Sequence, residues 1–157
     1  MEKIDIGLTV KQRETVINLL QTLLADEVAL YFAARGAHWN VVGVHFGPLH
    51  AFFQEQYEAV DEIMDEVAER IRMLGGKSTS TLDVYAKAKR VDDKAGQTKT
   101  ADEMLKSLLG VHEHVIRELR KDVDIASDNN DEGTADFLTG LMEQHEKMAW
   151  MVRAHLE

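Results

Sequence analysis

The chain has 157 residues, of which 45% are hydrophobic and 29% charged, and its formal net charge at pH 7 is -10. This length and composition predict one soluble domain over residues 1–157 with its own core, and the negative charge argues against binding to a nucleic-acid phosphate backbone. The absence of cysteine excludes disulfides, thiolate catalysis and zinc fingers, so histidine, carboxylate or amide oxygen must hold any metal.

The N-terminal segment lacks a cationic stretch followed by an apolar run, and we expect no segment to approach the roughly 20 apolar residues that cross a bilayer. Neither terminus carries a lysine-rich arm, which further argues against direct DNA binding. We therefore expect a cytoplasmic protein without a membrane span.

A single proline and long apolar repeats at helical spacing predict an all-helical chain. The first helix is predicted from about Val10 to Trp39. The second begins near residues 46–48, because proline is tolerated in a first turn, and it ends at Gly75 and Gly76.

Residues 77–100 are predicted to form a long crossover with room for one short helix around Leu82 to Ala88. Apolar positions then repeat from Leu105 to Val123 and from Phe137 to Val152, which predicts two more helices. Two helical hairpins joined by one long connection describe an all-α, ferritin-like four-helix bundle with a short helix in its crossover.

Three histidines lie within the thirteen residues HWNVVGVHFGPLH, which join the first two predicted helices. His38 ends the first helix and His50 begins the second, so a short connection would bring them together in a hairpin. His45 lies in that connection, where a solvent-facing position is expected. His38 and His50 are therefore candidate metal ligands.

The second helix carries a polar stripe, because steps of four and seven residues return near the same helical face. A solvated acidic face is the simplest interpretation of any single carboxylate there. Histidine and carboxylates on one stripe also suit metal binding. The members of the stripe are His50, Gln54, Asp61, Asp65 and Glu69.

Helix length keeps the two ends of this stripe apart. At a rise of about 1.5 Å per residue, His50 and Asp65 stand roughly 22 Å apart and cannot share an ion within one chain. If two copies of the helix pack antiparallel about a two-fold axis, the histidine end of one meets the carboxylate end of the other. Ferrous iron suits this mixture, with zinc as a competitor. The predicted shared site combines His38, His50 and Gln54 with Asp65 and Glu69 of the neighbouring chain.

Histidines also occur on the last two helices. A di-iron centre inside one bundle uses Glu-x-x-His on two helices, and no glutamate here has histidine three residues later. We therefore do not expect that centre. His112 and His145 lie on apolar helical faces, where hydrogen-bonded core histidines are the simplest interpretation.

Carboxylates gather around the turn between the last two helices, among them Asp131, Glu132 and Asp136. In one chain they would form a charged loop with helix caps. Around a symmetry axis of an assembly they would form a negative funnel that concentrates cations.

The segments HWNVVGVHFGPLHAFF and DEIMDEVAERIRMLGG resemble the signature of the Dps family, mini-ferritins that protect DNA during starvation. TADFLTGLMEQHEKMAWMVRAHLE resembles the last helix of that family, so the resemblance covers nearly the whole chain. It implies a hollow dodecamer that oxidises ferrous iron, typically with hydrogen peroxide, although dioxygen also serves, and that stores ferric mineral.

The resemblance also implies roles for single residues. His38 and His50 match the histidine ligands, and Trp39 matches the aromatic residue beside the centre. Asp65 and Glu69 match the carboxylates given by the neighbouring subunit. The carboxylates that line the three-fold pores are matched by Asp136, with Asp131 and Glu132 aligned less closely.

Gln54 departs from the family pattern, which places aspartate four residues after the second histidine. A neutral amide oxygen is a weaker donor to ferrous iron, so we expect lower iron occupancy or a changed metal preference, with Glu58 or Asp61 compensating. Three functions stay open: a peroxide-dependent ferroxidase and iron store, a zinc-binding shell with weak oxidation, and a DNA-coating structural protein, which charge and short termini disfavour.

Overall fold

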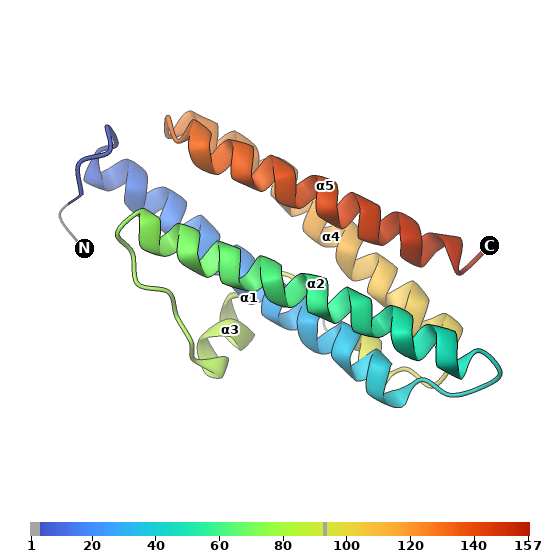
Figure 1. Cartoon of the computed structure of the whole chain (residues 1–157). Coiled ribbons are helices and arrows are strands. Elements are labelled where there is room, and N and C mark those ends of the chain that lie inside the picture. The colour runs from blue at the N-terminus through green and yellow to red at the C-terminus, as the bar shows by residue number, and fades with distance from the viewer. Residues whose placement is uncertain (1–3, 93) are drawn as a thin grey trace.

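The computed structural model describes residues 4–92 and 94–157, and this part of the chain contains helices and no β-strand (Figure 1). The crossover contains the short helix α3 (Leu82–Ala88) and the 3-10 turn η1 (Lys94–Gln97). The predicted all-α bundle with a short helix in the crossover is therefore confirmed. Its four long helices are α1 (Val10–Asn40), α2 (Phe46–Met73), α4 (Ala101–Asp128) and α5 (Glu132–Ala154).

Two antiparallel hairpins form the bundle, α1 with α2 and α4 with α5 (Figure 1). α1 begins at a capping box, in which the Thr9 side chain accepts from the Gln12 N–H and the Gln12 side chain accepts from the Thr9 N–H. Thr100 and Glu103 form the same arrangement at the start of α4. These bonds satisfy N–H groups that lack partners within the helix and so determine where each hairpin begins.

The chain leaves α2 at Gly75, which has a φ of +82°. A Cβ at this position would lie 2.6 Å from Cδ1 of Ile4. Glycine therefore suits both the left-handed backbone and the close packing, and the predicted stop of the second helix is confirmed.

The most apolar part of the chain is α1. By length and composition alone this helix could cross a membrane, so the expectation that no segment is long and apolar enough to do so was wrong. In the bundle, however, 67% of its apolar window is buried, and Leu20, Leu23 and Leu30 are fully enclosed. The apolar character of α1 matches its position at the centre of the core.

Arg90 ties the crossover to both hairpins. Its guanidinium nitrogens lie 2.7 Å from Asp26 of α1 and 2.9 Å from Asp122 of α4. Burial raises the pKa of the Asp26 carboxyl group, and the bonds from Arg90 oppose that effect. The long connection is thus held against the bundle by paired charges rather than by apolar packing alone.

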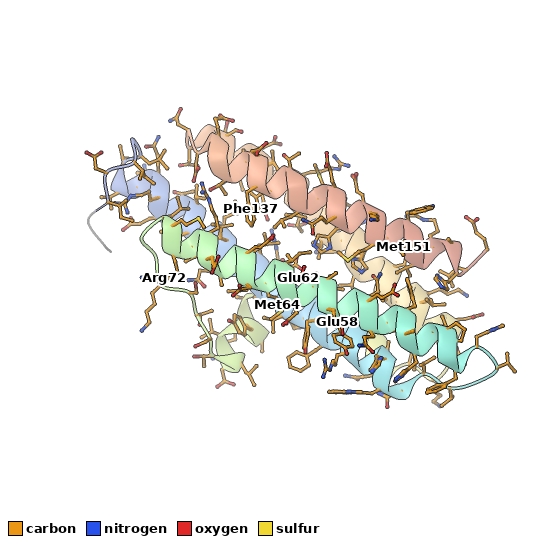
Figure 2. The ribbon with its side chains drawn as sticks, viewed as in Figure 1. Glu58, Glu62, Met64, Arg72, Phe137 and Met151 are labelled. Atoms are coloured by element: carbon orange, nitrogen blue, oxygen red, sulfur yellow. The ribbon has the colours of Figure 1, made fainter. Side chains whose placement is uncertain are left out.

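α2 has two unlike faces. Val60, Ile63 and Val67 are fully buried against the other helices. On the opposite side, the exposed carboxylates Glu58 and Glu62 project from the helix, whereas Phe137 and Met151 of α5 pack against the core (Figure 2). The exposed acidic face of α2 carries the predicted ligands.

Candidate metal centre

The connection between α1 and α2 brings His38 and His50 side by side, with ring centroids 3.7 Å apart. Nδ1 of His38 lies 2.8 Å from the carbonyl oxygen of His50, and Nδ1 of His50 lies 2.9 Å from the carbonyl oxygen of His38. Because a carbonyl oxygen only accepts, both Nδ1 atoms must donate, and in a neutral ring Nε2 then keeps its lone pair. The pair thus offers two oriented Nε2 atoms to a cation.

Aromatic side chains hold the two imidazoles in place. The Phe46 ring stacks on His50 at 5.0 Å, and Tyr57 meets His38 edge-on at 5.3 Å. The Arg35 guanidinium lies 4.3 Å from the Tyr57 ring centroid and covers it from outside. Phe46 and Tyr57 were not predicted as site residues, although they stand four residues before and seven after His50 on α2.

Trp39 lies at the edge of this pair rather than within it. Its side chain is 62% exposed, and its ring centroid lies 5.6 Å from the Arg35 guanidinium carbon. An exposed indole beside the histidines leaves a large apolar surface for a partner.

The side chain of Gln54 is exposed one turn beyond His50. Its amide Nε2 donates to Oε1 of Glu58 at 2.7 Å. The amide oxygen therefore stays free for a cation, and the Glu58 carboxylate contributes its charge next to the position where Gln54 lacks one.

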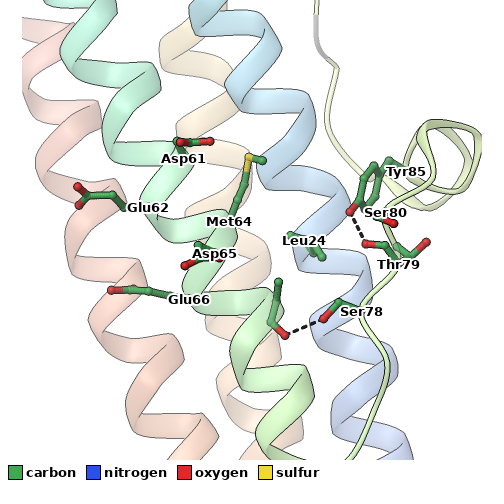
Figure 3. A pocket seen from close by; sticks show the side chains of 11 residues that line it. Leu24, Asp61, Glu62, Met64, Asp65, Glu66, Ser78, Thr79, Ser80 and Tyr85 are labelled. Carbon is green, nitrogen blue, oxygen red and sulfur yellow. Dashed lines mark hydrogen bonds between the residues drawn. The ribbon is translucent and has the colours of Figure 1, made fainter.

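The carboxylate end of the stripe lies farther along α2. Asp61 and Asp65 line a surface cleft of about 720 Å³ together with Glu62 and Glu66 (Figure 3). The crossover forms the facing wall, where the Ser78 hydroxyl donates to the Ala68 carbonyl at 2.7 Å. This wall was not predicted, because helical periodicity within α2 does not show where the crossover packs. It is made of Ser78, Thr79, Ser80 and Tyr85.

Because α2 is continuous from Phe46 to Met73, the ends of the stripe stay apart. Within the described part of one chain, no group of three or more His, Cys, Asp or Glu side chains is placed to hold a metal ion. The predicted ligands therefore lie in two separate groups of one chain, named below the histidine half-site (His38, His50 and Gln54) and the carboxylate half-site (Asp61, Asp65 and Glu69).

The three carboxylates predicted near a pore differ in their surroundings. Asp131 is 4% exposed, accepts from the Thr134 N–H at 3.0 Å as the N-cap of α5, and lies 3.1 Å from Arg70. Glu132 and Asp136 are exposed. Asp131 thus already has partners inside the subunit, and the other two remain available to cations outside it.

The chain matches the ferritin-like domain family over residues 17–157. The DNA protection during starvation protein 2 of Bacillus anthracis is 36% identical to it over 141 residues, which cover 90% of this chain and 96% of that protein. The chain belongs to the Dps family. Relatives from Bacillus anthracis and Brevibacillus brevis are named for DNA protection during starvation.

Solved Dps proteins share this fold closely. The Vibrio cholerae Dps protein, described as a ferritin-like diiron-carboxylate protein, has a TM-score of 0.92 and 30% identity, covering 100% of this chain and 98% of that one. The Mycobacterium smegmatis Dps has a TM-score of 0.90 and 35% identity, covering 99% and 95%. An uncharacterized low temperature-induced protein of Nostoc sp. is 44% identical over 158 residues, which cover 100% of this Dps chain and 88% of that protein.

Proposed function

We propose that this Dps-family protein oxidises ferrous iron, with hydrogen peroxide as the preferred oxidant, and stores the ferric product in a hollow cytoplasmic dodecamer. The reciprocal anchoring of His38 and His50 supports this function most directly, because it leaves both Nε2 lone pairs for a cation. Imidazole with carboxylate suits ferrous iron, and an incompletely filled coordination sphere leaves room for an oxidant.

The site is completed by a second subunit in this proposal. With two α2 helices antiparallel about a two-fold axis, the histidine half-site of one chain meets the carboxylate half-site of the other, and each dimer holds two identical sites. Exposed apolar side chains beside the histidine half-site support its burial in an interface. Trp39 is 62% exposed and Phe46 48%.

Each ligand has a distinct task. His38 and His50 bind the iron substrate through Nε2, while Asp65 and Glu69 of the neighbouring subunit offset the extra positive charge of the ferric state. Each ferrous ion loses one electron, and one peroxide molecule takes up two as its O–O bond breaks. The exposed carboxylates Glu132 and Asp136 attract ferrous ions toward the shell.

Protection of DNA would follow from this chemistry rather than from coating. The net charge of -10 opposes contact with the phosphate backbone. Consumption of peroxide together with ferrous iron removes the two reactants that generate hydroxyl radicals. A gel shift that persists at moderate salt would contradict this part of the proposal.

Stopped-flow oxidation tests the proposed site. The protein is loaded anaerobically with ferrous iron and mixed with peroxide, in the wild type, in Asp65→Ala and in Glu55→Gln. Glu55 is an exposed carboxylate on α2 that lies off the stripe, so Glu55→Gln is a matched control for charge. We expect fast oxidation in the wild type and the control, and loss in Asp65→Ala. Wild-type oxidation no faster than in buffer would overturn the ferroxidase function.

A zinc-binding shell with slow iron oxidation is the second candidate, because Gln54 supplies a neutral oxygen where a carboxylate would favour iron. Zinc titration followed by the same oxidation assay separates the two. Tight zinc binding with slow wild-type oxidation would favour this alternative, and fast oxidation that zinc inhibits only at high excess would exclude it.

A further inference from the structure

Four polar side chains meet inside the bundle, one from each long helix. Glu27 comes from α1, Gln56 from α2, His112 from α4 and His145 from α5. Glu27 and both histidines are 0% exposed, and Gln56 is 3% exposed. Polar groups this far from water need partners within the protein, so each donor and acceptor in the group has to be accounted for.

Three of these side chains form a connected chain of hydrogen bonds. Nε2 of His112 lies 3.2 Å from Oε1 of Gln56, and Nδ1 of His112 lies 3.2 Å from Nδ1 of His145. Because the amide oxygen accepts, Nε2 of His112 donates, and Nδ1 of the same neutral ring accepts from Nδ1 of His145. In a neutral His145 ring, Nε2 then has a lone pair.

That lone pair faces a carboxylate. Oε1 of Glu27 lies 3.0 Å from Nε2 of His145. Nevertheless, neither this nitrogen nor either carboxylate oxygen has a partner with the geometry of a hydrogen bond. An N–H on Nε2 of His145 that pointed at Oε1 of Glu27 would satisfy both atoms, but the His145 ring does not have this orientation. A fully buried carboxylate without a hydrogen-bond partner is strongly unfavourable, so these atoms point to a bound cation as their partner.

We infer that Glu27 and His145 form a second metal site inside each subunit, which binds one divalent first-row transition ion such as zinc, cobalt or ferrous iron. Nitrogen and oxygen ligands each about 2.1 Å from such an ion, at about a right angle, lie about 3 Å apart. The separation of Nε2 and Oε1 matches this arrangement. The site offers three donor atoms from two residues, and water completes the coordination.

His112 and Gln56 orient this site without touching the ion. Histidine ligands of metals usually donate their second ring N–H to a fixed acceptor, which determines the tautomer and the ring direction. Here Nδ1 of His145 donates to His112, which in turn donates to Gln56. The site differs from the Glu-x-x-His di-iron centre, which the sequence lacks, and it is independent of the half-sites on the surface of α2.

Cobalt binding to the assembled protein tests the inference, because its optical spectrum reports nitrogen and oxygen ligands. Asp65→Ala removes the proposed interface site, and Glu27→Gln then removes the interior carboxylate at almost constant volume. After long incubation, needed because the ligands are buried, we expect one cobalt ion per subunit in Asp65→Ala and none in the double variant. Equal cobalt content in the two proteins would overturn the site.

Two further measurements keep the test decisive if Glu27→Gln fails to assemble. Anomalous diffraction from cobalt-loaded Asp65→Ala crystals should place a peak between Glu27 and His145. A map without that peak, with the two side chains joined by a proton alone, would refute the inference. In the Asp65→Ala background, His112→Gln keeps both ligands but breaks the orienting chain, and it should weaken cobalt binding by about 10–100-fold.

One variant distinguishes a failure of the interior metal site from a failure of the ferroxidase proposal. Glu27→Gln in an otherwise wild-type protein should leave peroxide-driven iron oxidation within about twofold of the wild type, because the half-sites on α2 are unchanged. Loss of oxidation in this variant, despite normal assembly, would show that the interior residues serve the oxidation site and are not a separate metal site.

Discussion

The two histidine pairs of this Dps-family chain differ in burial and in the groups that orient their rings. His38 and His50 are partly exposed, and backbone carbonyls hold their rings so that both Nε2 atoms remain available. His112 and His145 are fully buried, and side chains of other helices hold them. The Nε2 atoms of a surface pair can hydrogen-bond to water, so they can remain without protein ligands until another subunit binds. A buried pair must find its partners within its own chain.

Mixing of defective chains is the most severe test of the surface pair. His50→Ala and Asp65→Ala should each lower the oxidation rate by more than about 100-fold, because each lacks a metal ligand. In a mixed dimer, one of the two shared sites is intact, so about half of the wild-type rate should return. Stopped-flow assays on verified mixed dimers measure this. Mixed dimers as inactive as their parents would contradict ligands shared across the interface.

Metal-linked stability tests the buried pair. In the Asp65→Ala background, cobalt at 100 times its Kd should stabilise the protein by about 2.7 kcal/mol, because it binds the folded state only. The same cobalt concentration should leave Asp65→Ala with Glu27→Gln unchanged. Thermal unfolding with and without cobalt measures the difference. An equal rise in both proteins would place the bound cobalt elsewhere.

Gln54 belongs to the surface site, where it is a neutral oxygen donor beside the partly exposed histidines. Gln54→Asp should tighten ferrous binding on the order of tenfold, about 1.4 kcal/mol, because a carboxylate attracts the cation and the amide does not. Ferrous titration and oxidation rates measure this, with Gln54→Leu as the control that removes the oxygen. Gln54→Asp behaving as the wild type would mean that Glu58 already supplies the missing charge.

The same contrast between buried and exposed groups occurs on a smaller scale at the α4–α5 turn. Asp131→Ala should lower the free energy of unfolding by about 1 kcal/mol, because it removes the N-cap of α5. Oxidation by this variant should stay normal. Asp136→Asn should instead slow iron uptake without changing stability. Denaturant unfolding measures the effect on stability, and mineralisation rates measure iron uptake. Slow uptake in Asp131→Ala alone would show that Asp131, rather than Asp136, serves the pore.

Local signals in the sequence determined the helices of this protein. Capping residues, proline near the start of α2 and glycine after its end act within one turn, so the boundaries could be predicted from neighbouring residues. The pairing of His38 with His50 was also within reach, because a short connection leaves antiparallel helices few alternatives. Helix length alone separated His50 from Asp65, which indicated a shared site before any contact was known.

Tertiary structure alone decided what each polar group meets. Phe46 and Tyr57 support the histidines, and the crossover forms the wall of the carboxylate cleft, through contacts that helical periodicity does not encode. Asp131 was predicted at an ion pore, which stays a prediction, and packing also pairs it with Arg70 of α2 inside the subunit. Glu27 and His145 lie 118 positions apart in the sequence, and only the assembly of the α1–α2 and α4–α5 hairpins into one bundle brings their unpartnered atoms to a separation of 3.0 Å. Sequence patterns therefore determined which side of each helix faces inward, whereas the depth and partners of a buried charge depended on three-dimensional packing.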